Sequence, residues 1–241
     1  MPDRRLWAAG LMLVVSTAGH AQTVDRDWFA EARKVVPGKP LADFTYTSSI
    51  EIDAQDETRR IVGKHLGGKT GDDAWVVLEA HNGNGKALEK KDQAERLDMD
   101  VPAYDELVSG LQEVSLMRED ETLAVYSVRR FESDPVQINT GVDLDLEMDD
   151  QEKLIGEVVV RKASPVGPFV ERVDLRLPEA EGFTLLATLD ALELGFGYSV
   201  DQETKSVLPT AMDINVAGSV VYFVKYDVAI NVTNAGFSLP E

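Results

Sequence analysis

The 241-residue sequence contains no cysteine, three histidines, and only 24 Lys and Arg residues against 43 Asp and Glu residues. The lack of cysteine excludes disulfide bonds, thiolate chemistry and cysteine-ligated zinc sites. The net charge of −19 argues against a nucleic-acid groove, because such grooves neutralise phosphates with Lys and Arg. Long apolar runs are also missing after the first 21 residues, so we expect no membrane-spanning helix.

The first 21 residues have the parts of a secretory signal peptide. Arg4 and Arg5 form a basic start, residues 6–15 are mostly apolar, and Gly19 and Ala21 place small side chains before a cleavage expected at Gln22. The apolar run is shorter than the roughly 20 residues that cross a bilayer. We therefore predict a signal peptide over residues 1–21. A chain of this size without disulfides further favours the periplasm of a Gram-negative bacterium over eukaryotic secretion.

Removal of this leader would make the chain slightly more acidic. Two arginines and one aspartate would be lost, so that residues 22–241 carry 22 basic against 42 acidic groups, a net charge of −20. A charge of this size favours solubility and repels anionic membrane surfaces within a Debye length. Because no cysteine follows the cleavage site, lipid attachment of the bacterial lipoprotein type is excluded.

Most of the remaining sequence alternates between apolar and polar residues, which is the period of a β-strand. The alternation predicts strands over residues 44–53, 58–66, 74–80, 114–117, 122–131, 142–149, 154–162, 169–177, 183–200, 207–216 and 220–232. Residues 183–200 are apolar on both sides near Leu185 and Leu186, so we expect that strand to be covered on both faces or bent at Gly195 and Gly197. Residues 217–219 are expected to form a turn.

Helical spacing occurs in only two segments. One begins at an expected Asp25 cap and contains Trp28 and Ala32. The other is opened by Pro102 and contains Tyr104 and Leu107. The charged residues 86–98 fit either a surface helix or a loop. We found no internal repeat and no linker, so residues 22–241 are expected to form a single domain.

Many consecutive antiparallel strands with one apolar face need a cover for that face. Two short helices are too small to cover it completely, and an empty apolar space is destabilising by about 24 cal/mol per Å³. We therefore predict a mainly β (α+β) fold: a large curved antiparallel sheet, as an open half-barrel with two or three short helices covering its concave face. A persistent apolar cavity in such a fold is typically a ligand site.

In this arrangement the chain resembles the LolA-like superfamily of periplasmic lipoprotein carriers and lipid-binding relatives. The resemblance lies in the order of elements across residues 22–241, and most of all in Leu208-Pro209, residues 216–219 and Tyr222-Phe223. It implies an unclosed barrel wrapped around helices, with an acyl-chain cavity between them. No functional residue of the carriers can be matched to a position in this chain.

The apolar and aromatic residues that face one way along these strands are the candidate cavity lining. Tyrosine suits a partly hydrated cavity, because its hydroxyl needs a hydrogen-bond partner or a water molecule. Plain core packing is the alternative for the same side chains, and Trp28 either plugs the cavity or anchors its helix. The candidate ligand-binding residues are Trp28, Phe44, Tyr46, Val173, Leu175, Tyr222, Val224 and Tyr226.

Catalytic and metal-binding motifs are sparse. After the leader only His65 and His81 remain, without cysteine and without the spacing of a zinc motif. His81 could serve a distant serine as a base, but the Gly-x-Ser-x-Gly elbow is absent. The acidic run of residues 143–150 could collect calcium, although Met148 stands where a calcium loop needs glycine; its carboxylates are those of Asp143, Asp145, Glu147, Asp149 and Asp150. We favour a solvated face for that run and predict no catalytic residue, metal or cofactor.

The sequence therefore predicts a periplasmic, non-enzymatic protein that binds a lipid, acyl chain or other apolar moiety in a sheet-lined cavity. One alternative is an acidic, β-rich interaction module that docks a basic envelope protein. The remaining alternative is a periplasmic hydrolase.

Overall fold

The computed structural model describes residues 26–55, 57–88, 97, 101–132, 154–184, 187–220 and 224–240. The strands are β1 (Thr45–Ala54), β2 (Glu57–His65), β3 (Trp75–Asn82), β4 (Leu111–Gln112), β5 (Ser115–Glu119), β6 (Leu123–Val128), β7 (Arg130–Phe131), β8 (Ile155–Arg161), β9 (Phe169–Arg176), β10 (Glu181–Thr184), β11 (Ala187–Val200), β12 (Val207–Val220) and β13 (Val224–Ser238). The expected signal peptide and the acidic run 143–150 lie outside the described residues.

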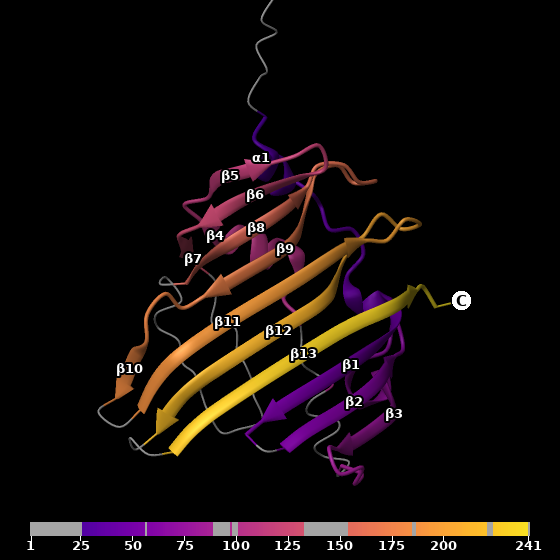
Figure 1. The fold of residues 1–241 in the computed structure, drawn as a ribbon. Coiled ribbons are helices and arrows are strands. Elements are labelled where there is room, and N and C mark those ends of the chain that lie inside the picture. The colour runs from indigo at the N-terminus through magenta and orange to yellow at the C-terminus, as the bar shows by residue number, and fades with distance from the viewer. Residues whose placement is uncertain are drawn as a thin grey trace, which may run out of the picture.

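Eleven of these strands form one antiparallel sheet (Figure 1). Ten of them lie in the order β3-β2-β1-β13-β12-β11-β9-β8-β6-β5, and β10 pairs with β11 beside this path. The last strand of the chain, β13, is inserted between β1 and β12 and so joins the first strands to the rest. The sheet is open, because β3 and β5 stand at opposite ends of the path. The predicted mainly β fold with one large antiparallel sheet is therefore confirmed.

The sheet has one apolar and one polar face, as the alternation predicts. In β1 the side chains of Ile50 and Ile52 are buried, while Glu51 and Asp53 are exposed. The register continues each face across the strands, since Ile50 lies opposite Val232 and Ile61. Burial of this aligned face is the main source of the favourable free energy that holds the strands together.

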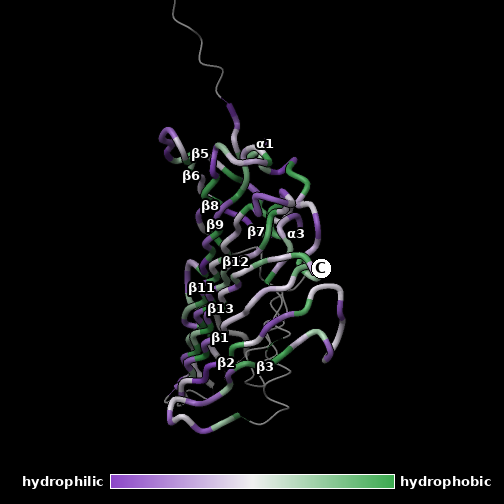
Figure 2. The backbone as a smooth tube through the Cα atoms, turned by 90° about the vertical axis from the view of Figure 1, so that its right-hand side faces the viewer, coloured by the Kyte–Doolittle hydropathy of each residue, from purple (hydrophilic) through white to green (hydrophobic). Residues whose placement is uncertain are grey.

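Two α-helices are present in the described part of the chain, α1 (Trp28–Ala32) and α3 (Tyr104–Gly110), with short 3₁₀ turns at Leu41–Asp43 and Gly71–Ala74. Both α-helices lie on the same side of the sheet (Figure 2). The cap of α1 is Asp27, whose carboxylate accepts a hydrogen bond from the N–H of Ala30 at 3.0 Å, and not the expected Asp25. Neither helix is long and apolar enough to cross a membrane.

Two sequence expectations about strand ends are wrong. The segment 183–200 is not one strand: its residues belong to β10 and β11, which pair with each other as a hairpin. Residues 217–219 do not form a turn but lie inside β12. Gly218 stands opposite Tyr226, and a Cβ there would lie 2.3 Å from the Tyr226 hydroxyl. The small residues 217–219 leave room for the side chain of Tyr226 on the neighbouring strand. In the sequence, such a run of small residues has the composition of a turn.

Candidate functional site

The apolar face of the sheet and the inner sides of α1 and α3 form one buried cluster, which we call the main core. Three candidate lining residues belong to it: Val173 and Leu175 on β9, and Tyr226 on β13. Their side chains are at most 8% exposed. From α3 the cluster receives Tyr104, Leu107 and Val108, residues that the helical spacing selected.

Phe44 and Tyr46 lie at the start of β1 and belong to a separate cluster, which we call the aromatic cluster. Tyr46 stacks on His65 with ring centres 4.9 Å apart, and Trp75 meets both rings edge-on. The Nδ1 of His65 lies 2.8 Å from the carbonyl oxygen of Phe44, so the ring is oriented by a backbone acceptor. The candidate residues are therefore divided between two clusters that the sequence pattern did not separate.

Trp28 anchors the start of α1 at the rim of the sheet. Its indole N–H donates to a carboxylate oxygen of Glu119 at 3.0 Å. Two cations lie against its ring: the guanidinium of Arg26 at 4.2 Å and the ammonium of Lys162 at 5.1 Å from the ring centre. These contacts favour the anchoring interpretation. Of the other candidates, Tyr222 lies outside the described residues, and only the backbone of Val224 is described.

Tyrosine hydroxyls connect the helices to the sheet, a feature that sequence reasoning missed. The hydroxyl of Tyr126 on β6 accepts a hydrogen bond from the N–H of Phe29 in α1 at 3.1 Å. The hydroxyl of Tyr198 on β11 donates to the carbonyl of Pro102, just before α3, at 2.8 Å. Burial raises the pKa of both tyrosines, so both stay protonated at neutral pH.

The hydroxyl of Tyr104 joins three elements. It donates to the carbonyl of Ala32 at the end of α1 and accepts from the N–H of Val170 on β9, both at 3.0 Å. The register of β8 against β9 shifts at this point, so that the N–H of Val170 is available to the hydroxyl. Burial raises the pKa of Tyr104 to about 12, against a smaller lowering by the Val170 N–H. No local sequence signal identifies such a contact, because its partners are 66 and 72 residues away.

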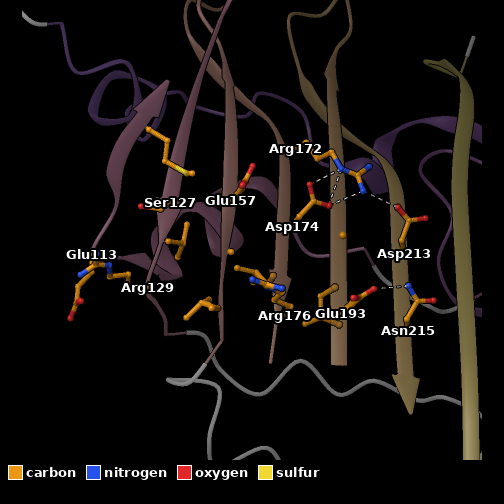
Figure 3. Close-up of a pocket in the computed structure, with 17 residues that line it drawn as sticks. Glu113, Ser127, Arg129, Glu157, Arg172, Asp174, Arg176, Glu193, Asp213 and Asn215 are labelled. Carbon is orange, nitrogen blue, oxygen red and sulfur yellow. Dashed lines mark hydrogen bonds and ion pairs between the residues drawn. The ribbon is translucent and has the colours of Figure 1, made fainter. Parts of the chain in front are cut away.

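The opposite, polar face of the sheet carries a depression of about 880 Å³ over β5, β6, β8, β9, β11 and β12 (Figure 3). Its floor follows one transverse row of the sheet, in which the register pairs run from Ser127 to Glu157, Asp174, Gly195 and Asp213. Five carboxylates and three guanidinium groups line it: Glu113, Glu157, Asp174, Glu193, Asp213, Arg129, Arg172 and Arg176.

Gly195 lies in the middle of the floor of the depression. Over it lies the guanidinium of Arg172, which hydrogen-bonds both oxygens of Asp174 at 2.8–2.9 Å and reaches Asp213 at 3.4 Å. A Cβ at Gly195 would lie 3.0 Å from Arg172 and 3.2 Å from each carboxylate. The glycine that the sequence marked as a bend is thus the position that admits this ion-pair bridge. The depression was not predicted, because its residues come from six strands and the segments between them.

Within the described residues, both ring nitrogens of His81 face acceptors. Nε2 of His81 lies 2.6 Å from a carboxylate oxygen of Glu79, and Nδ1 lies 3.0 Å from the carbonyl of Asn82. Because both neighbours are acceptors, neither ring nitrogen faces a hydroxyl that it could deprotonate. Among the described residues, no group of three His, Cys, Asp or Glu side chains could hold a metal ion.

Comparison of the chain with protein-family models, curated proteins and solved structures gave no match. These comparisons neither support nor contradict the LolA-like resemblance.

Proposed function

We propose that this protein is a non-enzymatic envelope protein that binds a lipid, acyl chain or other apolar moiety between the sheet and the helices. In this proposal residues 22–241 form an open half-barrel of the LolA-like kind, with the helices covering its concave face. Residues 1–21 direct the chain to the periplasm. The ligand lies along the apolar face, where Val173, Leu175 and Tyr226 contact it.

One observation carries this proposal: among the described residues, a continuous apolar sheet face is opposed by two short α-helices. Inward-facing residues of strands from β6 to β2 belong to the main core, whereas α1 has five residues and α3 has seven. Helices of this length are unstable alone and depend on their contacts with the sheet. A cover that is held by a few tyrosine hydrogen bonds can separate from the sheet more readily than a second sheet could.

The direct test is mass spectrometry of the organic extract of native protein, followed by loading with a fluorescent fatty-acyl probe. We expect co-purifying lipid, or saturable binding of one probe per chain. Leu175→Trp would place a large ring on the apolar face and is expected to weaken probe binding about tenfold or more, because overpacking fills the space the chain would use. Leu175 is 2% exposed in the main core.

Arg176→Trp is the matched control, since the neighbouring residue on β9 points to the polar face. It should bind the probe as the wild type does. Circular dichroism checks that both variants fold. A wild-type protein that neither co-purifies with nor takes up any acyl chain would contradict the proposal.

The depression on the polar face supports a second candidate function, the docking of a basic segment of an envelope protein. Its five carboxylates outnumber its three guanidinium groups, in a chain of net charge −19. Charge complementarity of this kind accelerates and orients association. The two functions are compatible, because they use opposite faces of the sheet.

A further inference from the structure

A polar row interrupts the otherwise apolar face of the sheet. Ser48 on β1 lies directly opposite Asn234 on β13 and Gly63 on β2. On one side of Ser48 is Ile50, in the main core, and on the other is Tyr46, in the aromatic cluster. The polar row therefore separates the two clusters.

Hydrogen bonding within the polar row is incomplete. Asn234 is only 5% exposed, and its side-chain Nδ2 donates a hydrogen bond to the carbonyl of Pro209 at 3.3 Å. Its Oδ1 is buried and accepts no hydrogen bond from any group in the described part of the chain. Ser48 is 3% exposed and lies opposite Asn234 on the neighbouring strand. Buried polar atoms without partners are rare in native proteins, because their desolvation is uncompensated.

The surroundings define which group would complete the row. Among the described residues, the buried polar side chains are those of Ser48, His65, Ser206 and Asn234, and none of them is Lys, Arg, Asp or Glu. On β2 the side chain of Leu97 covers Gly63, because a Cβ added at Gly63 would lie only 2.6 Å from that side chain. A carboxylate or phosphate would therefore meet an acceptor oxygen and no buried cation, which is unfavourable. A neutral hydroxyl or amide N–H would donate to Asn234 Oδ1, and the Ser48 hydroxyl could donate to or accept from the same group.

We propose that Asn234 and Ser48 bind the neutral hydrogen-bond donor of an amphiphile whose hydrocarbon chain lies along the apolar face. The ligand class is a neutral lipid with a hydroxyl or amide head, such as a monoacylglycerol, and not an ionised fatty acid. This inference rests on the proposed lipid-binding function and names the ligand class of that site.

The experiment compares two probes with the same hydrocarbon chain, 1-monooleoylglycerol and oleate, at pH 8 and below their aggregation concentrations. Each is titrated against the full mature chain by displacement of a fluorescent acyl probe. We expect the neutral lipid to bind about tenfold more tightly, the size of one well-formed buried hydrogen bond. Asn234→Leu should abolish that preference by weakening the neutral lipid about tenfold while leaving oleate unchanged.

Asn231→Leu is the matched control: the same substitution on the same strand, at an exposed position of the polar face. It should retain the preference. Ser48→Ala provides a second variant at the polar row if Asn234→Leu does not fold, and it should weaken the neutral lipid about threefold.

The outcomes separate this inference from the function on which it rests. If neither probe binds the wild type, the lipid-binding proposal itself fails, and this inference fails with it. If both probes bind equally and the Asn234 and Ser48 variants change neither affinity, the polar row holds only an internal water molecule. That result would overturn the inference and leave lipid binding intact.

Discussion

At the scale of single residues, three tyrosine hydroxyls determine where the helices lie on the sheet. Helices of five and seven residues cannot persist through their own hydrogen bonds. Tyr126, Tyr198 and Tyr104 each pair with a backbone group that would otherwise be left unsatisfied at a helix end or a strand irregularity. The apolar part of each ring adds to the core, while the hydroxyl fixes the position of the helix.

Removal of the Tyr104 hydroxyl should therefore be disproportionately destabilising. Tyr104→Phe removes one of the two donors to the carbonyl of Ala32, which also accepts from the N–H of Val35, and leaves the N–H of Val170 without the hydroxyl acceptor. We expect the free energy of unfolding to fall by about 2–4 kcal/mol, measured by urea denaturation. Tyr226→Phe is the control, because the hydroxyl of Tyr226 makes one bond, to the carbonyl of Thr188 at 3.2 Å, and its loss should cost about 1 kcal/mol.

The pH dependence gives this prediction a second measurement. The pKa of Tyr104 is raised from 10.0 to about 12, so its contribution to stability is fully present below pH 10 and is lost as the pH rises toward 12. The decline in wild-type stability over this window should be shallower in Tyr104→Phe. Equal losses from Tyr104→Phe and Tyr226→Phe would contradict the assigned role of Tyr104.

At the scale of elements, strands were predicted best where apolar and polar residues alternate and turns are polar. The segments 44–53, 154–162 and 169–177 correspond closely to β1, β8 and β9. Prediction failed at residues 183–200 and 217–219, because small or apolar residues there serve cross-strand packing. Gly218 is an example, since its neighbour Tyr226 is on another strand. Local sequence cannot distinguish such a glycine from a turn glycine.

The end of the sheet formed by β1, β2 and β3 carries a chain of charges from Glu51 through Arg60 and Glu79 to His81. The carbonyl of Asn82 and, next, the carboxylate of Glu79 raise the pKa of His81 above its ordinary value of 6.5. Because the folded-state pKa is raised, the associated stabilisation is present below pH 6.5 and is lost as the pH rises through the raised value.

NMR titration of the imidazole protons measures this shift. Glu79→Gln replaces the carboxylate that faces His81 with a neutral amide and should move the pKa of His81 back toward 6.5. Glu51→Gln removes a carboxylate that pairs with Arg60 and has no bond to His81, so it should leave the titration nearly unchanged. An unshifted His81 in the wild type would show that the bond to Glu79 does not form in solution.

At the scale of the whole molecule, the open sheet offers two chemically different faces. One is apolar and lies under the helices, and the other is polar and carries the depression centred on Gly195. Lipid binding and protein docking would therefore be altered by different substitutions. Asn234, on the apolar face, and Glu157, in the depression, are positions at which the two proposals are tested separately.

Docking of a basic partner should depend on the depression and not only on net charge. Glu157→Gln together with Glu193→Gln is expected to weaken binding of a decalysine peptide about fivefold at low salt. Asp53→Asn together with Asp227→Asn removes the same charge from exposed positions outside the depression and should have little effect. Both affinities, measured by fluorescence anisotropy, should fall with added salt. Equal losses in the two double variants would show that the peptide responds only to the overall negative field.

The two-faced strands, many of their bounds and the two short helices were predictable, because each depends on side-chain spacing within one segment. The insertion of β13 beside β1, the division of Val173 and Tyr46 between two clusters, and the row in which Asn234 meets Ser48 became visible only in the folded chain. Alternation specifies the face on which a side chain lies, whereas strand order and register specify its neighbours. Those neighbours are set by the combined burial and hydrogen bonding of segments far apart in the chain.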